Sequence, residues 1–138
     1  MEQFNLDIII PTRKYLSMKA DTLIVNTADG ERSFYAHMYD LICPLEISPL
    51  IIKYNGHIAN FAIGGGTLEV SHKTNTITLL LNTIESLKEI DVIKAKQVIE
   101  EAEKLKLEAK TKRDIIEAER RILRSLNRLS VKNNYKDY

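Results

Sequence analysis

The residues of this chain that could do chemistry are few, and their spacing matches no catalytic motif. Gly64, Gly65 and Gly66 form the one glycine cluster. A strand-like run follows this cluster, so it opens no helix on which a phosphate could rest. We therefore expect a bulge or a close approach of strands there. The other candidate residues are His37, His57, His72 and the single Cys43.

These side chains do not predict an active site. The three histidines lie in separate strand or turn regions, whereas metal ligands must converge. A lone cysteine forms no internal disulfide, suits a reducing compartment, and is expected to be a small core residue. No phosphate loop, nucleophile elbow or paired-carboxylate motif occurs. The sequence therefore predicts a protein that is not an enzyme and requires no cofactor or metal.

The composition narrows the class of protein further. The chain has 138 residues and a formal net charge of +1, which argues against a dedicated nucleic-acid binder. No run of about 20 apolar residues is present, so we expect no membrane-spanning helix. The first residues lack the basic and apolar regions of a secretory signal.

The elements that must position the site fall into two halves. All five glycines and all three prolines lie at or before Gly66. These residues mark turns and disfavour helix interiors, so the first half is predicted to be β structure and the rest mainly helical. Residues 1–85 hold 6 Lys and Arg against 9 Asp and Glu, and residues 86–138 hold 14 against 10. We predict two domains with these bounds.

The first domain shows the pattern of short strands joined by turns. Phe4–Ile10 alternates apolar and polar residues, which is typical of a half-buried strand. Asn55-Gly56 lies between two apolar runs and predicts a hairpin. Strands are expected at residues 4–10, 22–27, 41–45, 50–54, 57–63, 67–71 and 76–81. Such a pattern predicts a small antiparallel β-sandwich or barrel.

The second domain is predicted to be two helices. Apolar residues recur at spacings of three and four, and residues 106–113 between them form a polar turn. The first stripe is Val92, Ala95, Val98 or Ile99, Ala102 and Leu105, and the second is Ile115, Ala118, Ile122, Leu126 and Leu129. Both stripes are thin, so an antiparallel hairpin would bury little apolar surface and could detach from the sandwich. Because no helix breaker lies between the two stripes, the sequence permits a single extended helix as well as a hairpin.

Four segments, in order, resemble one family over nearly the full chain. Phe4–Ile10 with Pro11-Thr12 resembles its first strand, and Asn26-Thr27-Ala28-Asp29-Gly30-Glu31 is similar to its Asp-Gly-Glu turn. Gly65-Gly66-Thr67-Leu68-Glu69-Val70 is similar to its Gly-Gly-Phe-Leu-Glu-Val strand. Residues 90–95 and 126–131 resemble its C-terminal helices. The family is the epsilon subunit of bacterial F-type ATP synthases.

The resemblance implies an α+β protein, in which an N-terminal antiparallel β-sandwich precedes a C-terminal antiparallel two-helix hairpin. It implies a non-catalytic part of the central stalk that binds the gamma subunit and the c-ring. Such a subunit couples ATP synthesis and hydrolysis to proton transport, and it lies at the cytoplasmic side of the cell membrane through the complex alone. Glu31, His37 and Met38 match the loop region implied to contact these partners.

The resemblance also implies that the helical arm regulates hydrolysis. An extended arm would enter the catalytic head of alpha and beta subunits, where basic side chains meet acidic ones. Residues with the required charge and position are Arg120, Arg121, Arg124, Arg128 and Lys132. An ordinary solvated helix face explains the same charges.

Some members of the family bind ATP in the compact state through an Ile/Leu-Asp-x-x-Arg-Ala motif. This chain has Ile90-Asp91-Val92-Ile93-Lys94-Ala95, so lysine replaces the bidentate arginine. The candidate ATP-binding residues are Glu85, Ile90, Asp91, Lys94, Ala95, Arg124 and Arg128. We expect weak regulatory binding, and the alternative is that Asp91 is a helix-terminal residue without a ligand.

The segment Arg32-Ser33-Phe34-Tyr35-Ala36-His37-Met38-Tyr39-Asp40 departs from the family pattern. This divergence leaves open an epsilon-like subunit of a specialised rotary ATPase. A separate alternative is a stand-alone adaptor, in which the β-sandwich displays a coiled-coil arm to another partner. A small nucleotide-handling enzyme is disfavoured because phosphate loop and general base are missing.

Overall fold

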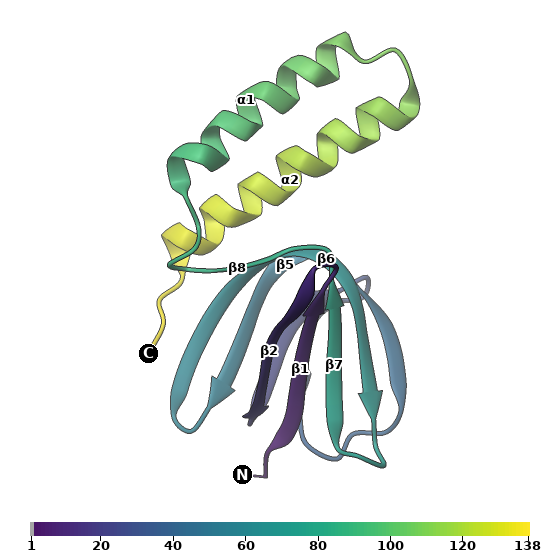
Figure 1. The fold of residues 1–138 in the computed structure, drawn as a ribbon, viewed down its shortest axis with the longest axis vertical. Coiled ribbons are helices and arrows are strands. Elements are labelled where there is room, and N and C mark those ends of the chain that lie inside the picture. The colour runs from purple at the N-terminus through teal and green to yellow at the C-terminus, as the bar shows by residue number, and fades with distance from the viewer. Residues whose placement is uncertain (1) are drawn as a thin grey trace.

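Strands fill the first part of the computed structural model, which describes residues 2–138, and helices fill the last part (Figure 1). The strands are β1 (Phe4–Ile10), β2 (Arg13–Ala20), β3 (Thr22–Thr27), β4 (Gly30–Phe34), β5 (Leu41–Tyr54), β6 (His57–Ser71), β7 (Thr76–Leu81) and β8 (Ile84–Ser86). The helices are α1 (Val92–Glu108) and α2 (Lys112–Asn134), which form a hairpin at one end of the strands.

Two long strands, β5 and β6, connect the two layers of the sandwich, because each of them runs through both layers. The strand order is β2-β1-β7-β6-β5-β3-β4, and β8 pairs with β6. β7 pairs with the second half of β6, and β3 pairs with the second half of β5. The β5–β6 ladder steps from the pair Leu45 and Gly66 to the pair Ile47 and Gly64, which marks an irregularity in both strands. There the hairpin passes from one layer to the other.

The glycine cluster lies at this passage. Gly65 and Gly66 have φ values of +86° and +155°, which residues with a Cβ atom rarely adopt. A Cβ on Gly66 would overlap the carbonyl oxygen of Leu80 and lie 2.9 Å from the Cα of Leu81. The expected close approach of strands is confirmed, whereas no bulge forms, because β6 keeps the same register with its neighbours on both sides of the cluster.

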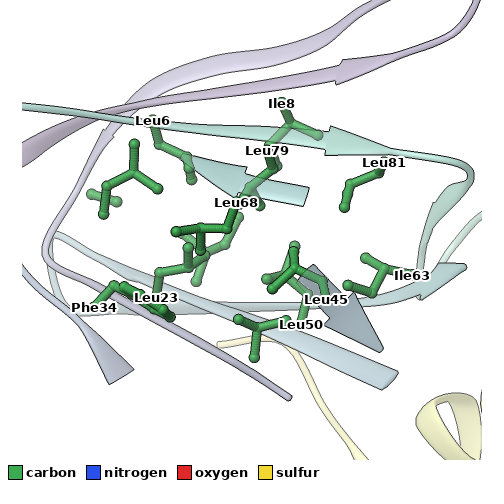
Figure 2. Packing of buried hydrophobic residues seen from close by; sticks show 14 of the residues in the cluster. Leu6, Ile8, Leu23, Phe34, Leu45, Leu50, Ile63, Leu68, Leu79 and Leu81 are labelled. Carbon is green, nitrogen blue, oxygen red and sulfur yellow. The ribbon is translucent and has the colours of Figure 1, made fainter. Parts of the chain in front are cut away.

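The core lies between the layers and is made mostly of aliphatic side chains from both, together with the buried rings of Phe4 and Phe34. Figure 2 shows Leu6, Ile8 and Leu79 pointing toward Leu23 and Leu50 of the facing layer. All five are fully buried. Cys43 is also buried in this cluster, as expected for a small core residue.

The predicted β-sandwich with a following helical hairpin is confirmed, with one refinement to its sheet. β1 and β7 pair in parallel, so the sheet is mixed. The short strand predicted at residues 41–45 is wrong, because β5 continues through Pro44 and Pro49. Neither proline interrupts a ladder, since Pro44 precedes the pairing with β3 and Pro49 lies at its register shift. β2, β4 and β8 were not predicted.

The helical hairpin is confirmed, with a change in which residues are buried. Asp91 and Thr111 are the N-caps, and their side chains accept from the backbone N–H groups of Lys94 and Asp114 at 3.0 and 3.2 Å. The buried residues of the hairpin are Ala95, Ala102, Ala118, Ser125 and Val131. Leu105 and Leu126, predicted for the stripes, are about half exposed instead (47% and 49%).

Gly66→Ala should lower the free energy of unfolding by about 3 kcal/mol, because its Cβ meets backbone atoms that cannot move independently. Gly56→Ala is the matched control: its φ is +80°, but nothing lies within 4 Å, so about 1 kcal/mol is expected from backbone strain alone. Urea unfolding of both variants measures the difference. Equal losses would contradict the close approach at Gly66.

Candidate functional site

The helical arm, residues 87–138, is joined to the sandwich mainly through α2. α1 packs on α2, while α2 also packs on β5 and β6. The Asn127 side chain donates to the backbone oxygens of Ser48 and Ile63, at 2.8 and 3.3 Å. One amide thus bridges β5 and β6, and it positions the helix on the passage between the layers.

A small apolar cluster lies where the arm begins and ends. It contains Ala62 of β6, Ile90 before α1 and Val131 of α2, with Leu87 and Tyr135 packed against it. Ile90 is 5% exposed, and its packing in this cluster supports the start of the arm.

The connection between β8 and α1 is held by Glu89. Its carboxylate accepts from the Tyr15 hydroxyl on β2 and from the backbone N–H of Ser86, at 2.9 Å for the latter. These hydrogen bonds, that from Tyr15 above all, lower the pKa of Glu89. Burial, followed by the hydrogen bond and charge of Glu89, raises the pKa of Tyr15 to about 12.

A hollow of about 410 Å³ opens between this connection, α1 and α2. Its size suits a small-molecule ligand. Its lining residues are Glu85, Glu89, Asp91, Lys94, Ala95, Val98 and Arg128.

Most charged side chains of the hollow already have hydrogen-bond partners within the protein. Arg128 donates to the Glu85 carboxylate, and its side chain and that of Glu85 are 22% and 28% exposed. Asp91 caps α1 and Glu89 accepts a hydrogen bond from Tyr15, while Lys94 lines the hollow and is exposed. Three carboxylates against two cations disfavour a free polyphosphate unless a cation accompanies it or Arg128 exchanges its partner.

Five of the seven predicted ATP-binding residues line this hollow, and two do not. The five are Glu85, Asp91, Lys94, Ala95 and Arg128. Ile90 is buried in the small apolar cluster, and Arg124 lines a different hollow with Arg120 and Glu117. The Arg124 chain passes beside Gly64, where burial, followed by the charges of Arg128 and Arg120, lowers its pKa. A role for any of these residues in binding ATP stays a prediction.

The predicted partner-binding residues lie on three separate surfaces. Glu31 is exposed near the β3–β4 turn, at one end of β4, whereas His37 and Met38 follow the other end. The loop of His37 packs on the β6–β7 turn, since its N–H donates to the Asn75 side chain at 2.8 Å. Of the basic residues on α2, Lys132 donates to the Leu87 carbonyl and Arg128 is paired. Arg120 is exposed, and Arg121 lines a hollow near the hairpin turn.

Residues 3–87 match the family model described as ATP synthase, Delta/Epsilon chain, beta-sandwich domain. The chain is 36% identical to the ATP synthase epsilon chain of Caldicellulosiruptor bescii, over 99% of this chain and 98% of the relative. This chain belongs to the ATP synthase epsilon family. It is also 30% identical to the sodium ion specific ATP synthase epsilon chain of Propionigenium modestum, over 98% and 97% of the two chains.

Two solved structures show the same fold as this epsilon chain. One is a chain in the mitochondrial ATP synthase OSCP/F1/c-ring of Euglena gracilis, with a TM-score of 0.73, 22% identity, and 90% and 79% of the two chains covered. The other is in the central stalk/c-ring of the Tetrahymena thermophila mitochondrial enzyme, with a TM-score of 0.65, 14% identity, and 95% and 97% covered.

Sequence reasoning about the site missed Tyr15, Glu89 and Asn127. Tyr15 lies on a strand that was not predicted, and Glu89 directly precedes the Ile90-Asp91 motif without belonging to it. Asn127 lies next to Leu126 of the predicted stripe, and its spacing gave no signal of its contact with β5 and β6. Neither α1 nor α2, the helices of residues 2–138, combines the length and apolar character needed to cross a bilayer. No group of potential metal ligands forms among the same residues.

Tyr15→Phe should raise the pKa of Glu89, because it removes the largest cause of the lowering. A lowered carboxyl pKa stabilises the fold above the unfolded value of about 4.3, and this stabilisation is lost as pH falls through the folded value. The raised pKa of Tyr15 acts in the other range: its stabilisation is complete below pH 10 and is lost as pH rises toward about 12.

Chemical denaturation between pH 3 and 12 measures the free energy of unfolding. This free energy should therefore fall less at both pH extremes in Tyr15→Phe than in the unchanged protein. Tyr54→Phe is the control, because Tyr54 is a half-buried tyrosine with no contact to Glu89 among those described. Parallel pH profiles for all three proteins would contradict the Tyr15–Glu89 contact.

Proposed function

We propose that this chain is a non-catalytic rotor subunit of the ATP synthase central stalk. Its sandwich binds the gamma subunit and the c-ring, and so couples ATP synthesis and hydrolysis to ion transport. The proposal rests on family membership and on the fold shared with chains of the two solved complexes, an OSCP/F1/c-ring complex and a central stalk/c-ring complex. The chain then lies at the cytoplasmic side of the membrane, attached through the complex.

The helical arm is proposed to regulate ATP hydrolysis by moving between a compact and an extended position. The observation that carries this is that both helices of the arm expose large apolar side chains. Ile93, Leu107 and Leu123 are 72%, 88% and 54% exposed, and Ile116 is 52% exposed. Such side chains cost free energy in water and would be covered beside the catalytic head.

The basic residues of α2 support the same movement. In the compact position Arg128 and Lys132 bond to Glu85 and Leu87, and Arg124 lies partly buried beside like charges. Extension releases these cations and makes them available to acidic side chains of a beta subunit. Compact and extended positions thus exchange one set of charge contacts for another.

Weak ATP binding in the compact position is the second part of the proposal. The adenosine would enter the hollow beside Ala95 and Val98, and the phosphates would meet Lys94 and Arg128. Arg128 would have to turn from Glu85 toward the ligand, and Lys94 offers a point charge instead of a fork. Both features predict an affinity in the weak range.

Removal of residues 87–138 should raise the rate of ATP hydrolysis by the reconstituted catalytic head with gamma, because the inhibiting arm is gone. The full chain with Arg120→Ala should show a partial rise, since Arg120 is exposed in the compact position and can meet an acidic partner. Hydrolysis rates measured with the full chain set the reference. Equal rates with and without the arm would defeat the regulatory role and leave the coupling role standing.

Lys94→Arg should strengthen ATP binding about tenfold, because the guanidinium adds a bidentate contact to a phosphate. Lys96→Arg is the matched control, since Lys96 lines another hollow on the far side of α1. NMR titration of the purified chain with MgATP measures both. Shifts confined to the lining of the 410 Å³ hollow are expected, and no response of either variant at several millimolar would exclude the nucleotide site.

A further inference from the structure

Two segments of the chain lie end to end along the edge of β6 that faces away from β5. β8 pairs antiparallel with residues 61–63 of β6. Residues 136–138, which we call the tail segment, lie along residues 58–60 of the same edge, also antiparallel. The chain therefore leaves this edge at Ser86, forms both helices, and returns to the edge at Lys136 (Figure 1).

The pairing of the tail segment has the geometry of a strand ladder. Ile58 and Tyr138 exchange both backbone hydrogen bonds: the Ile58 N–H donates to the Tyr138 oxygen at 3.0 Å, and the Tyr138 N–H donates to the Ile58 oxygen at 2.8 Å. This is the closely bonded pair of an antiparallel ladder.

Asn60 adds a recognition element to the ladder. Its backbone N–H donates to the Asp137 carboxylate at 2.7 Å, and its side-chain amide donates to the Lys136 carbonyl at 2.7 Å and to the same carboxylate at 3.2 Å. Asn60 is 2% exposed. When the tail segment departs, these donors lose their partners in the chain and water must take the place of the tail segment.

We propose that residues 58–60 of β6 form a docking site for an extended peptide, and that its ligand is the tail segment of the same chain. Docking closes the arm, because the arm is then tied to one strand edge at both of its ends. The regulatory consequence of closure rests on the proposed function, whereas the docking itself does not.

The contacts identify the tail segment as the occupant rather than an arbitrary strand. The backbone bonds would accept many sequences, but Asp137 adds a charged acceptor matched to the buried Asn60. Tyr135, one residue before the tail segment, packs on the cluster of Ala62, Ile90 and Val131. This contact delivers the tail segment to the edge in the observed register.

Asp137→Ala should accelerate hydrogen exchange of the Asn60 amide about tenfold or more, because it removes a charge-assisted acceptor. Deletion of residues 136–138 should do the same for both Ile58 and Asn60. Lys136→Ala is the matched control, since its contact with Asn60 uses the backbone oxygen. The amides of Leu50 and Ile52 report on the core and should not change.

Spin labels at Lys53 and Lys110, both exposed, test closure of the arm in the same proteins. The tail variants should populate longer label distances than the unchanged chain and Lys136→Ala. Unchanged exchange at Ile58 and Asn60 would overturn the docking site, and faster exchange with an unchanged distance distribution would overturn closure. Both measurements use the isolated chain, so they decide the inference even if the arm proves to have no effect on hydrolysis.

Discussion

The close approach of backbones at Gly66 is the constraint on which the rest of this structure depends. A side chain at this position would collide with Leu80 and Leu81. Only glycine there allows β6 to pair with β7 through its second half while its first half lies in the other layer. The passage brings the two halves of β6 into both layers of the sandwich. It also presents the carbonyl of Ile63 to Asn127, and it leaves the edge of residues 58–63 open for β8 and the tail segment.

The attachment of the arm to this edge is mainly polar, and its apolar part is small. Asn127, Arg128 and Lys132 each bond to the sandwich or its connection, while three side chains form the buried cluster beside them. Polar contacts exchange with water or with a partner at modest net cost, in contrast to a large apolar interface. An arm held in this way is suited to a regulated change of position, which is the property that the proposed function requires.

Much of the fold could be predicted because its signals are local. The glycine and proline break, the Asn55-Gly56 hairpin and the stripes of Ala95 and Ala118 each act over a few residues, and the structure bears them out. β2, β4 and β8 escaped prediction because they are edge or very short strands whose charged and apolar residues show little alternation. The choice of Leu126 as a buried residue was wrong because the seam between the helices accepts the small Ser125 instead.

The residue pattern alone established a β-sandwich with a helical arm, the family resemblance, and the candidate residues of the motif around Asp91. Folding then distributed those candidates in a way no spacing reveals. Arg124 and Arg128 are one helical turn apart, yet Arg128 reaches Glu85 in the hollow while Arg124 passes over Gly64. Two hydrogen bonds join residues more than 70 positions apart: that between Asn60 and Asp137, and that between Tyr15 and Glu89. Such contacts depend on strand register and on where α2 lies against β6, and these are properties of the packed chain that short-range patterns do not encode.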